Sequence, residues 1–140
     1  MDSLMRMAQS VALFRSMYIK HARSEVGGSG SWRFLVMVGQ YDGGRGVRPA
    51  ELAAYFHCSK AYVSKMVKEL AGEGLVEERP DPNDGRSRIL VCSENGNKIL
   101  QEIMTEYLAV TKKLRDGLGE RRSRMLVELL EESIAILERD

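Results

Sequence analysis

The sequence predicts a mainly α-helical fold that carries one small β-hairpin. Three observations lead to this prediction. Apolar residues recur at helical spacing over most of the 140-residue chain. Two short helical patterns meet at a tight turn at His57 and Cys58, and a turn rich in proline and glycine separates two strand-like segments between Leu75 and Cys92. A helix-turn-helix followed directly by a hairpin is the layout of a winged helix-turn-helix, here flanked by further helices.

Two helices are expected before this motif. The first runs from about Ser3 to about Val26, and the glycine-rich residues 27–31 end it as a flexible link. Its apolar stripe recurs at three- and four-residue steps and consists of Leu4, Met7, Val11, Phe14 and Tyr18. Ser31 can cap a second helix from Trp32 to about Gln40, which is apolar nearly all round, as expected of a central buried helix.

The helix-turn-helix occupies residues 49–70. Ala53 is small where the two helices must cross closely, and Ser59 is a suitable N-cap for the second helix because its hydroxyl can accept a free backbone N–H. Gly72 and Gly74 end that helix. The expected small core of the motif consists of Leu52, Phe56, Val63, Val67 and Leu70.

The second helix of the motif carries a basic face. Three lysines and no acidic residue occur from Ser59 to Lys68, and acidic residues begin only at Glu69. This distribution suits a helix that enters a phosphate-lined DNA groove by its N-terminus. The candidate DNA-binding residues on this helix are Ser59, Lys60, Ala61, Tyr62, Ser64, Lys65 and Lys68.

The hairpin is predicted from a strand at 75–79, a turn at 80–85 and a return strand at 86–92. Arg86 and Arg88 are two residues apart and therefore project from the same face of a strand. An arginine at a hairpin tip fits a narrow DNA minor groove, and we expect Asp84 to organise the tip through an ion pair with Arg86 or Arg88. Taken alone, the hairpin is equally compatible with an ordinary surface turn; its place after a helix-turn-helix favours DNA contact.

The chain resembles the multiple antibiotic resistance regulator (MarR) family of winged-helix transcription factors. The resemblance covers nearly the whole chain and implies DNA binding through the candidate residues above. Two departures are notable: Gly85 stands where many members have a first wing arginine, which leaves Arg86 as the main candidate for the minor groove, and His57 stands in a turn that often contains glycine. The resemblance rests on residues 52–53, 59–70, 74–76, 84–87 and 90–96.

Two further helices follow the hairpin. Ser93 is expected to cap a long helix that Gly117 and Gly119 end, and a last helix runs from about Glu120 to about Glu138. The apolar stripes of the terminal helices predict a homodimer, which the resemblance also implies; packing of these helices within one chain is the alternative. The predicted organisation is an N-terminal dimerisation helix and link (1–30), a DNA-binding lobe (31–92) and C-terminal dimerisation helices (93–140) in one compact subunit.

The resemblance further implies that a small aromatic or anionic effector binds between the dimer helices and the DNA-binding lobe. Arg15, Tyr18, His21 and Trp32 could line such a pocket, although Tyr18 and Trp32 are equally compatible with core positions and Arg15 and His21 with the surface. The DNA partner is expected to be a pseudo-palindromic operator whose half-sites lie about 10 base pairs apart.

Other functions are disfavoured by what the sequence lacks. Its two histidines have no metal-ligand spacing, and no P-loop, nucleophile elbow or zinc motif occurs, so we expect neither an enzyme nor a metal or cofactor. The N-terminus lacks a signal core and no apolar run reaches membrane-spanning length, which with the two unpaired cysteines predicts a cytoplasmic protein. For Cys58 and Cys92 we favour small buried hydrophobes over redox sensors. The remaining alternative is a winged-helix module that binds protein and not DNA.

Overall fold

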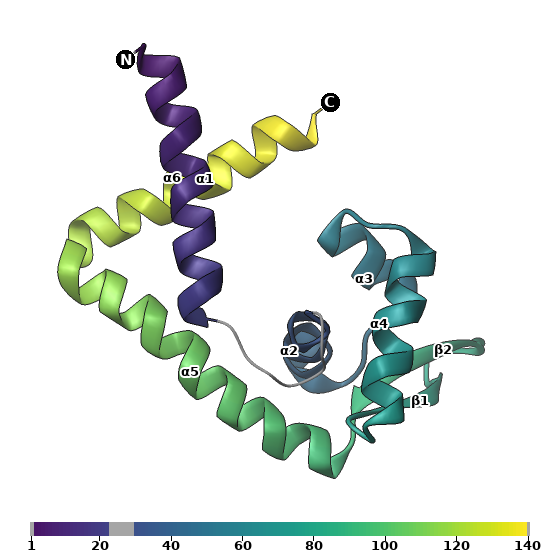
Figure 1. Cartoon of the computed structure of the whole chain (residues 1–140). Coiled ribbons are helices and arrows are strands. Elements are labelled where there is room, and N and C mark those ends of the chain that lie inside the picture. Colours follow the sequence, from purple (N-terminus) through teal and green to yellow (C-terminus); the bar gives the residue numbers. More distant parts are fainter. Residues whose placement is uncertain (1, 23–29, 140) are drawn as a thin grey trace. The chain divides into compact units, whose positions relative to one another are not determined.

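The structure, a computed structural model, describes residues 2–22 and 30–139 (Figure 1). Over these residues it contains six α-helices, one short 3-10 helix and a two-stranded antiparallel sheet. This confirms the mainly helical fold with a hairpin wing. In chain order the elements are α1 (Ser3–Ala22), α2 (Trp32–Gln40), η1 (Tyr41–Gly44), α3 (Pro49–Phe56), α4 (Lys60–Gly72), β1 (Val76–Asp81), β2 (Asp84–Cys92), α5 (Glu94–Leu118) and α6 (Glu120–Glu138).

The chain divides into two compact units. The first, which we call the helical unit, consists of Met1–Ala22 and Tyr107–Asp140, and the second, which we call the winged-helix unit, is Arg23–Glu106. Helix α5 contributes its first half to the winged-helix unit and its second half to the helical unit. The candidate DNA-binding residues all belong to the winged-helix unit.

The core of the winged-helix unit forms where α2, α3, α4 and the hairpin meet. Helix α2 supplies Phe34, Leu35 and Val38, each at most 1% exposed, as its apolar sequence predicts. The ring of Phe34 lies 4.4 Å from that of Phe56 at the end of α3. The other fully buried apolar side chains of this core are Val47, Leu52, Val63, Met66, Leu70 and Leu90. This packing fixes the position of α4 within the unit.

The turn between α3 and α4 forms without a glycine. His57 itself takes the left-handed backbone conformation (φ +50°, ψ +47°), which is uncommon for a residue with a side chain. The backbone N–H of Cys58 then donates to the carbonyl of Ala53 at 3.1 Å. Ser59 begins α4 as predicted, with its hydroxyl accepting the backbone N–H of Tyr62 at 3.1 Å.

Two details differ from the sequence-based expectations, and a third cannot be compared with the structure. Ser31 precedes α2, but its hydroxyl makes no capping hydrogen bond and is buried without a partner. The hairpin turn is only Pro82 and Asn83, because both strands extend into the segment expected to form the turn. Helix α1 is described to Ala22, so its expected end near Val26 and most of the glycine-rich link lie outside the described residues.

The base of the hairpin is joined tightly to the start of α5. The hydroxyl of Ser93 donates to the carbonyl of Gly74 at 2.6 Å and accepts the backbone N–H of Gly96 at 2.9 Å, which confirms Ser93 as the cap of α5. The backbone N–H of Ser93 donates to the carbonyl of Leu75 at 3.0 Å. A Cβ atom added at Gly96 would lie only 1.9 Å from this Leu75 oxygen, so only glycine fits the contact.

The helical unit leaves much of its apolar surface exposed. Tyr18 of α1 contacts the second half of α5, where its hydroxyl lies 2.8 Å from that of Thr111 and its ring meets the edge of Tyr107. No residue of α6 is buried. Its exposed apolar side chains are Met125, Val127, Leu129, Leu130, Ile134, Ile136 and Leu137, and those of α1 include Leu4, Met7, Val11, Leu13 and Phe14.

Candidate nucleic-acid interface

Helix α4 presents two different faces. Val63, Met66 and Leu70 are buried at 1% exposure or less. The residues proposed to contact DNA are all exposed, namely Ser59, Lys60, Ala61, Tyr62, Ser64, Lys65 and Lys68. The helical spacing of the apolar residues therefore predicted the buried and the exposed face of α4 correctly. The three lysines lie on the exposed face, where they can approach a phosphate backbone.

Tyr62 has a second role that the sequence did not reveal. Its ring packs at 5.9 Å on the edge of the buried Phe34 ring, although the residue remains 37% exposed. On α3, Tyr55 is 60% exposed and packs against Phe56. Tyr62 is therefore held against the core while part of the residue remains exposed.

The wing carries its polar side chains outward. Asp84, Arg86 and Arg88 are all exposed on β2. In place of the ion pair expected for Asp84, one carboxylate oxygen accepts the backbone N–H of Arg86 and the other accepts the hydroxyl of Ser87, both at 3.1 Å. Asp84 therefore shapes the tip through hydrogen bonds and leaves the guanidinium group of Arg86 available.

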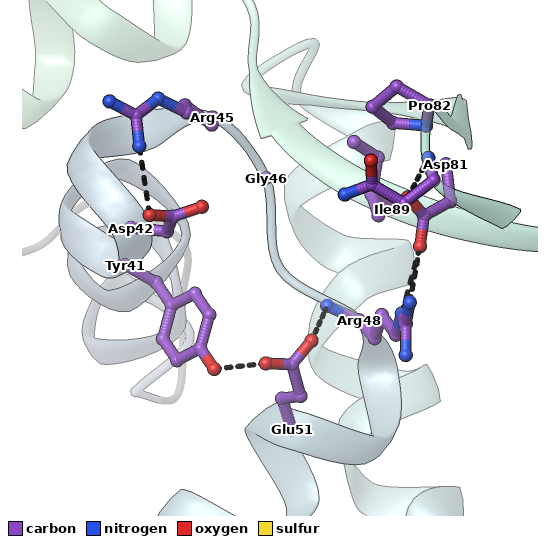
Figure 2. A pocket seen from close by; sticks show the side chains of 10 residues that line it. Tyr41, Asp42, Arg45, Gly46, Arg48, Glu51, Asp81, Pro82 and Ile89 are labelled. Atoms are coloured by element: carbon purple, nitrogen blue, oxygen red, sulfur yellow. Dashed lines mark hydrogen bonds and ion pairs between the residues drawn. The ribbon is translucent and has the colours of Figure 1, made fainter.

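A polar network missed by the sequence reasoning lies between the start of α3 and the wing. Figure 2 shows Arg48, which immediately precedes α3, directed at Asp81 at the end of β1. The Nε and Nη2 atoms of Arg48 donate to the same oxygen of Asp81 at 3.0 and 2.7 Å. Glu51 of α3 accepts the backbone N–H of Arg48 at 3.1 Å and also the hydroxyl of Tyr41.

The charges of this network shift several pKa values. The pKa of Asp81 is lowered, first by the hydrogen bond from the backbone of Asn83 and then by that from Arg48. The same hydrogen bond from Arg48 raises the pKa of its own guanidinium group, and the hydrogen bond to Glu51 raises the pKa of Tyr41. A cavity of about 560 Å³ opens between these residues (Figure 2). Sequence could not reveal the Arg48–Asp81 pair, because 33 residues separate its partners and no local period joins them.

The residues proposed for an effector pocket separate into the two units. Tyr18 and His21 line a largely apolar cavity of about 450 Å³ in the helical unit, together with Phe14, Lys113 and Leu114. Arg15 is exposed and does not line this cavity. Trp32 belongs to the winged-helix unit, where it is only 6% exposed. In the described part of the chain no cluster of histidine, cysteine or carboxylate side chains could hold a metal ion.

Comparison with known proteins agrees with this geometry. Residues 27–87, which include the motif, β1 and the tip of the wing, match the sequence profile of the MarR family. The winged-helix part of the chain is thus similar to the MarR family. This is a family of winged helix-turn-helix transcriptional regulators and not of enzymes. The resemblance seen in the sequence is thereby confirmed.

Individual relatives of the chain are distant. It is 29% identical over 83 residues to the uncharacterized HTH-type transcriptional regulator YdgG of Bacillus subtilis (strain 168); these residues are 58% of this chain and 55% of YdgG. The match thus spans about half the length of that relative.

Two solved structures are similar over nearly their whole length. The MarR family regulator NMB1585 of Neisseria meningitidis superposes with a TM-score of 0.78 at 20% identity, covering 99% of this chain and 96% of that one. FabT of Streptococcus pneumoniae, solved in complex with DNA, has a TM-score of 0.68 at 17% identity and covers 97% and 93%. At these identities the likeness shows the fold. None of the described helices is both long enough and apolar enough to span a membrane.

The environment of Cys92 leads to a prediction about its reactivity. Burial raises the pKa of this thiol from its ordinary value of 9.0 to about 11, so at pH 8 it holds roughly 100-fold less thiolate than in the unfolded chain. We expect iodoacetamide at pH 8 to alkylate Cys92 on the order of 100-fold more slowly in the native protein than in urea, as followed by peptide mass spectrometry. Equal rates in the two states would show that the thiol is open and would restore Cys92 as a candidate redox sensor.

Proposed function

We propose that this chain is a homodimeric, sequence-specific DNA-binding transcriptional regulator that acts in the cytoplasm, as a ligand-responsive repressor. The observation that carries the proposal is the exposed face of α4. It presents three lysines, two hydroxyl-bearing side chains and no acidic residue up to Lys68, while the opposite face is locked into the core. Such a helix can enter the major groove and read base edges.

The wing and the terminal helices complete the proposed binding mode. Arg86 and Arg88 on the exposed wing would reach the minor grooves that flank each major-groove contact. The exposed apolar faces of α1 and α6 are the surface that two subunits would bury against each other. A two-fold dimer of this kind would bind a pseudo-palindromic operator with half-site centres about 10 base pairs apart.

The cavity lined by Tyr18 and His21 supports regulation by a small aromatic or anionic effector. Its wall is mainly apolar, which suits an aromatic ring, and Lys113 supplies a cationic group that could meet a carboxylate or phenolate. Arg15 and Trp32 do not line this cavity and are not part of the proposed site. Titration of the protein–operator complex with small aromatic acids tests the proposed effector site. If none of these compounds changes the affinity for the operator, the proposed effector site is wrong.

The competing function is a winged-helix module that binds protein partners. Selection of bound sequences from random duplex DNA, followed by measurement of affinity across a salt series, separates the two. A DNA reader enriches a palindromic sequence and loses affinity steeply as salt rises, because each neutralised phosphate releases counterions. Failure to enrich any sequence, together with no binding at low salt, would favour the protein-binding alternative.

Substitutions on α4 should affect DNA binding in two ways, by changing the preferred sequence or by weakening binding to every sequence. Ser64→Ala and Tyr62→Phe remove base-facing hydroxyls and should change the preferred sequence, each reducing discrimination by about 1–3 kcal/mol at one position. The Tyr62→Phe change retains the ring contact with Phe34 and so spares the core. Lys68→Ala should weaken binding to all sequences alike and lower the salt slope by about one per subunit.

The measurement is repeated sequence selection together with salt-dependent titration of each variant. Lys112→Ala, an exposed lysine of the helical unit, is the matched control and should leave sequence preference unchanged. Unaltered affinity and preference in a chain with alanine at Tyr62, Ser64 and Lys65 would exclude α4 as the reading helix.

A further inference from the structure

The outer part of the wing has little apolar contact with the rest of the winged-helix unit. Along β1 only the two end residues, Val76 and Asp81, are buried, and the four residues between them are exposed. On β2 the segment from Asp84 to Arg86 is exposed as well. A two-stranded hairpin without a packed face is only marginally stable in water. Its position must therefore be fixed by something other than a hydrophobic core.

The contact that reaches this outer part is the ion pair between Arg48 and Asp81. The Asp81 side chain is only 5% exposed although it is charged, whereas that of Arg48 is 47% exposed. Both Nε and Nη2 of Arg48 donate to one carboxylate oxygen, while the other oxygen accepts the backbone N–H of Asn83 in the turn at 2.9 Å. Asp81 thus joins the hairpin turn to the start of α3.

Arg48 is itself held firmly. Its backbone N–H is accepted by Glu51, which belongs to the first turn of α3, and its neighbour Val47 exchanges two backbone hydrogen bonds with Leu90 of β2, at 3.0 and 2.8 Å. Figure 2 shows the contacts of Arg48 with Glu51 and with Asp81, which cross from the start of α3 to the wing. Because α3 also packs on α4 through the motif core, the pair links the wing to the recognition helix.

We propose that the Arg48–Asp81 ion pair clamps the wing in place, and that Arg48 is thereby a positioning residue for the contact of Arg86 with DNA. The second half of this inference rests on the proposed function. Asp81 and Asp84 face each other across the hairpin turn, and Arg86 follows two residues later. Release of Asp81 therefore lets the hairpin turn, and with it the segment that carries Arg86, move away from the start of α3.

The Asp81→Asn variant distinguishes a role of Asp81 in positioning the wing from a direct effect of its negative charge on DNA binding. Asparagine keeps the shape of the side chain and an oxygen for the N–H of Asn83, but it loses the charge that holds Arg48. Removing a negative charge near DNA should strengthen binding if charge alone matters. The clamp predicts the opposite, a loss of operator affinity on the order of tenfold with the salt slope lowered by about one per subunit.

A double-variant cycle shows whether the pair acts through the wing. In the Arg86→Ala background, Asp81→Asn should cause no further loss of affinity, because the contact that it positions is already absent. Asp42→Asn is the matched control, since it breaks the exposed Arg45–Asp42 pair beside the same cavity and should not weaken binding. Tighter binding by Asp81→Asn, or an equal loss in both backgrounds, would overturn the proposed positioning.

A measurement without DNA tests the clamp separately from the function. A nitroxide label is attached through Gly85→Cys in a background with Cys58→Ser and Cys92→Ala; a side chain at position 85 meets no atom within 4 Å. The label should become measurably more mobile with Asp81→Asn and with Arg48→Gln, and not with Asp42→Asn. Unchanged mobility refutes the clamp even where DNA binding holds. Increased mobility in a chain that binds no operator supports the clamp and refutes only the proposed function.

Discussion

A chain carrying both Leu130→Asp and Ile134→Asp is expected to be monomeric at micromolar concentration and to lose operator affinity by more than about 100-fold. The two residues lie one turn apart on α6 and are 45% and 53% exposed in the single chain. Aspartate at these positions therefore disturbs little within one subunit. In a dimer the same carboxylates would be buried without partners, and a monomer would cover only one half-site. Sedimentation velocity and operator titration measure the two effects.

The control is Arg124→Asp together with Glu128→Asp. This pair has the same spacing on the same helix and the same change in net charge, −2 per chain, but at 100° per residue it lies on the polar side of α6. It should leave the chain dimeric. The prediction is contradicted if the unaltered chain sediments as a well-folded monomer at micromolar concentration, since the apolar faces of α1 and α6 would then need another explanation.

Gly96→Ala should destabilise the fold by about 2–4 kcal/mol and lower the melting temperature by roughly 10 °C. The added Cβ would lie 1.9 Å from the carbonyl oxygen of Leu75 and 2.9 Å from its carbon, and both are backbone atoms that cannot rotate away. Movement of Leu75 would break its hydrogen bond with Ser93 and so separate the base of the wing from α5. Urea unfolding at a fixed protein concentration measures the loss.

Gly117→Ala provides the comparison on the same helix. Position 117 lies inside α5, and a Cβ there would meet no atom within 4 Å. Because alanine loses less backbone entropy than glycine in a helix, this change should stabilise the chain by about 0.5–1 kcal/mol. Similar effects of the two substitutions would indicate that the close approach at Gly96 is absent in solution.

Several parts of the structure could be predicted from the sequence because they depend on neighbouring residues. The spacing of Val63, Met66 and Leu70 placed one face of α4 in the core, and the serines at 59 and 93 cap α4 and α5 as their positions predicted. Caps and periodic faces depend on residues within about four positions of each other, so a single sequence contains the information.

The tertiary structure decided the features that join distant segments. Ser31 stands in an N-cap position, but its hydroxyl is buried without a hydrogen-bond partner, so the residue type at the cap position did not predict a capping bond. The Arg48–Asp81 pair and the approach of Gly96 to Leu75 bring together residues 33 and 21 positions apart, which no local pattern encodes. The sequence by itself therefore indicated the resemblance to the family, the helices and the basic exposed face of α4. Only the packing of the chain in three dimensions decided how the wing is held against the start of α3, since the position of a hairpin depends on contacts outside its own strands.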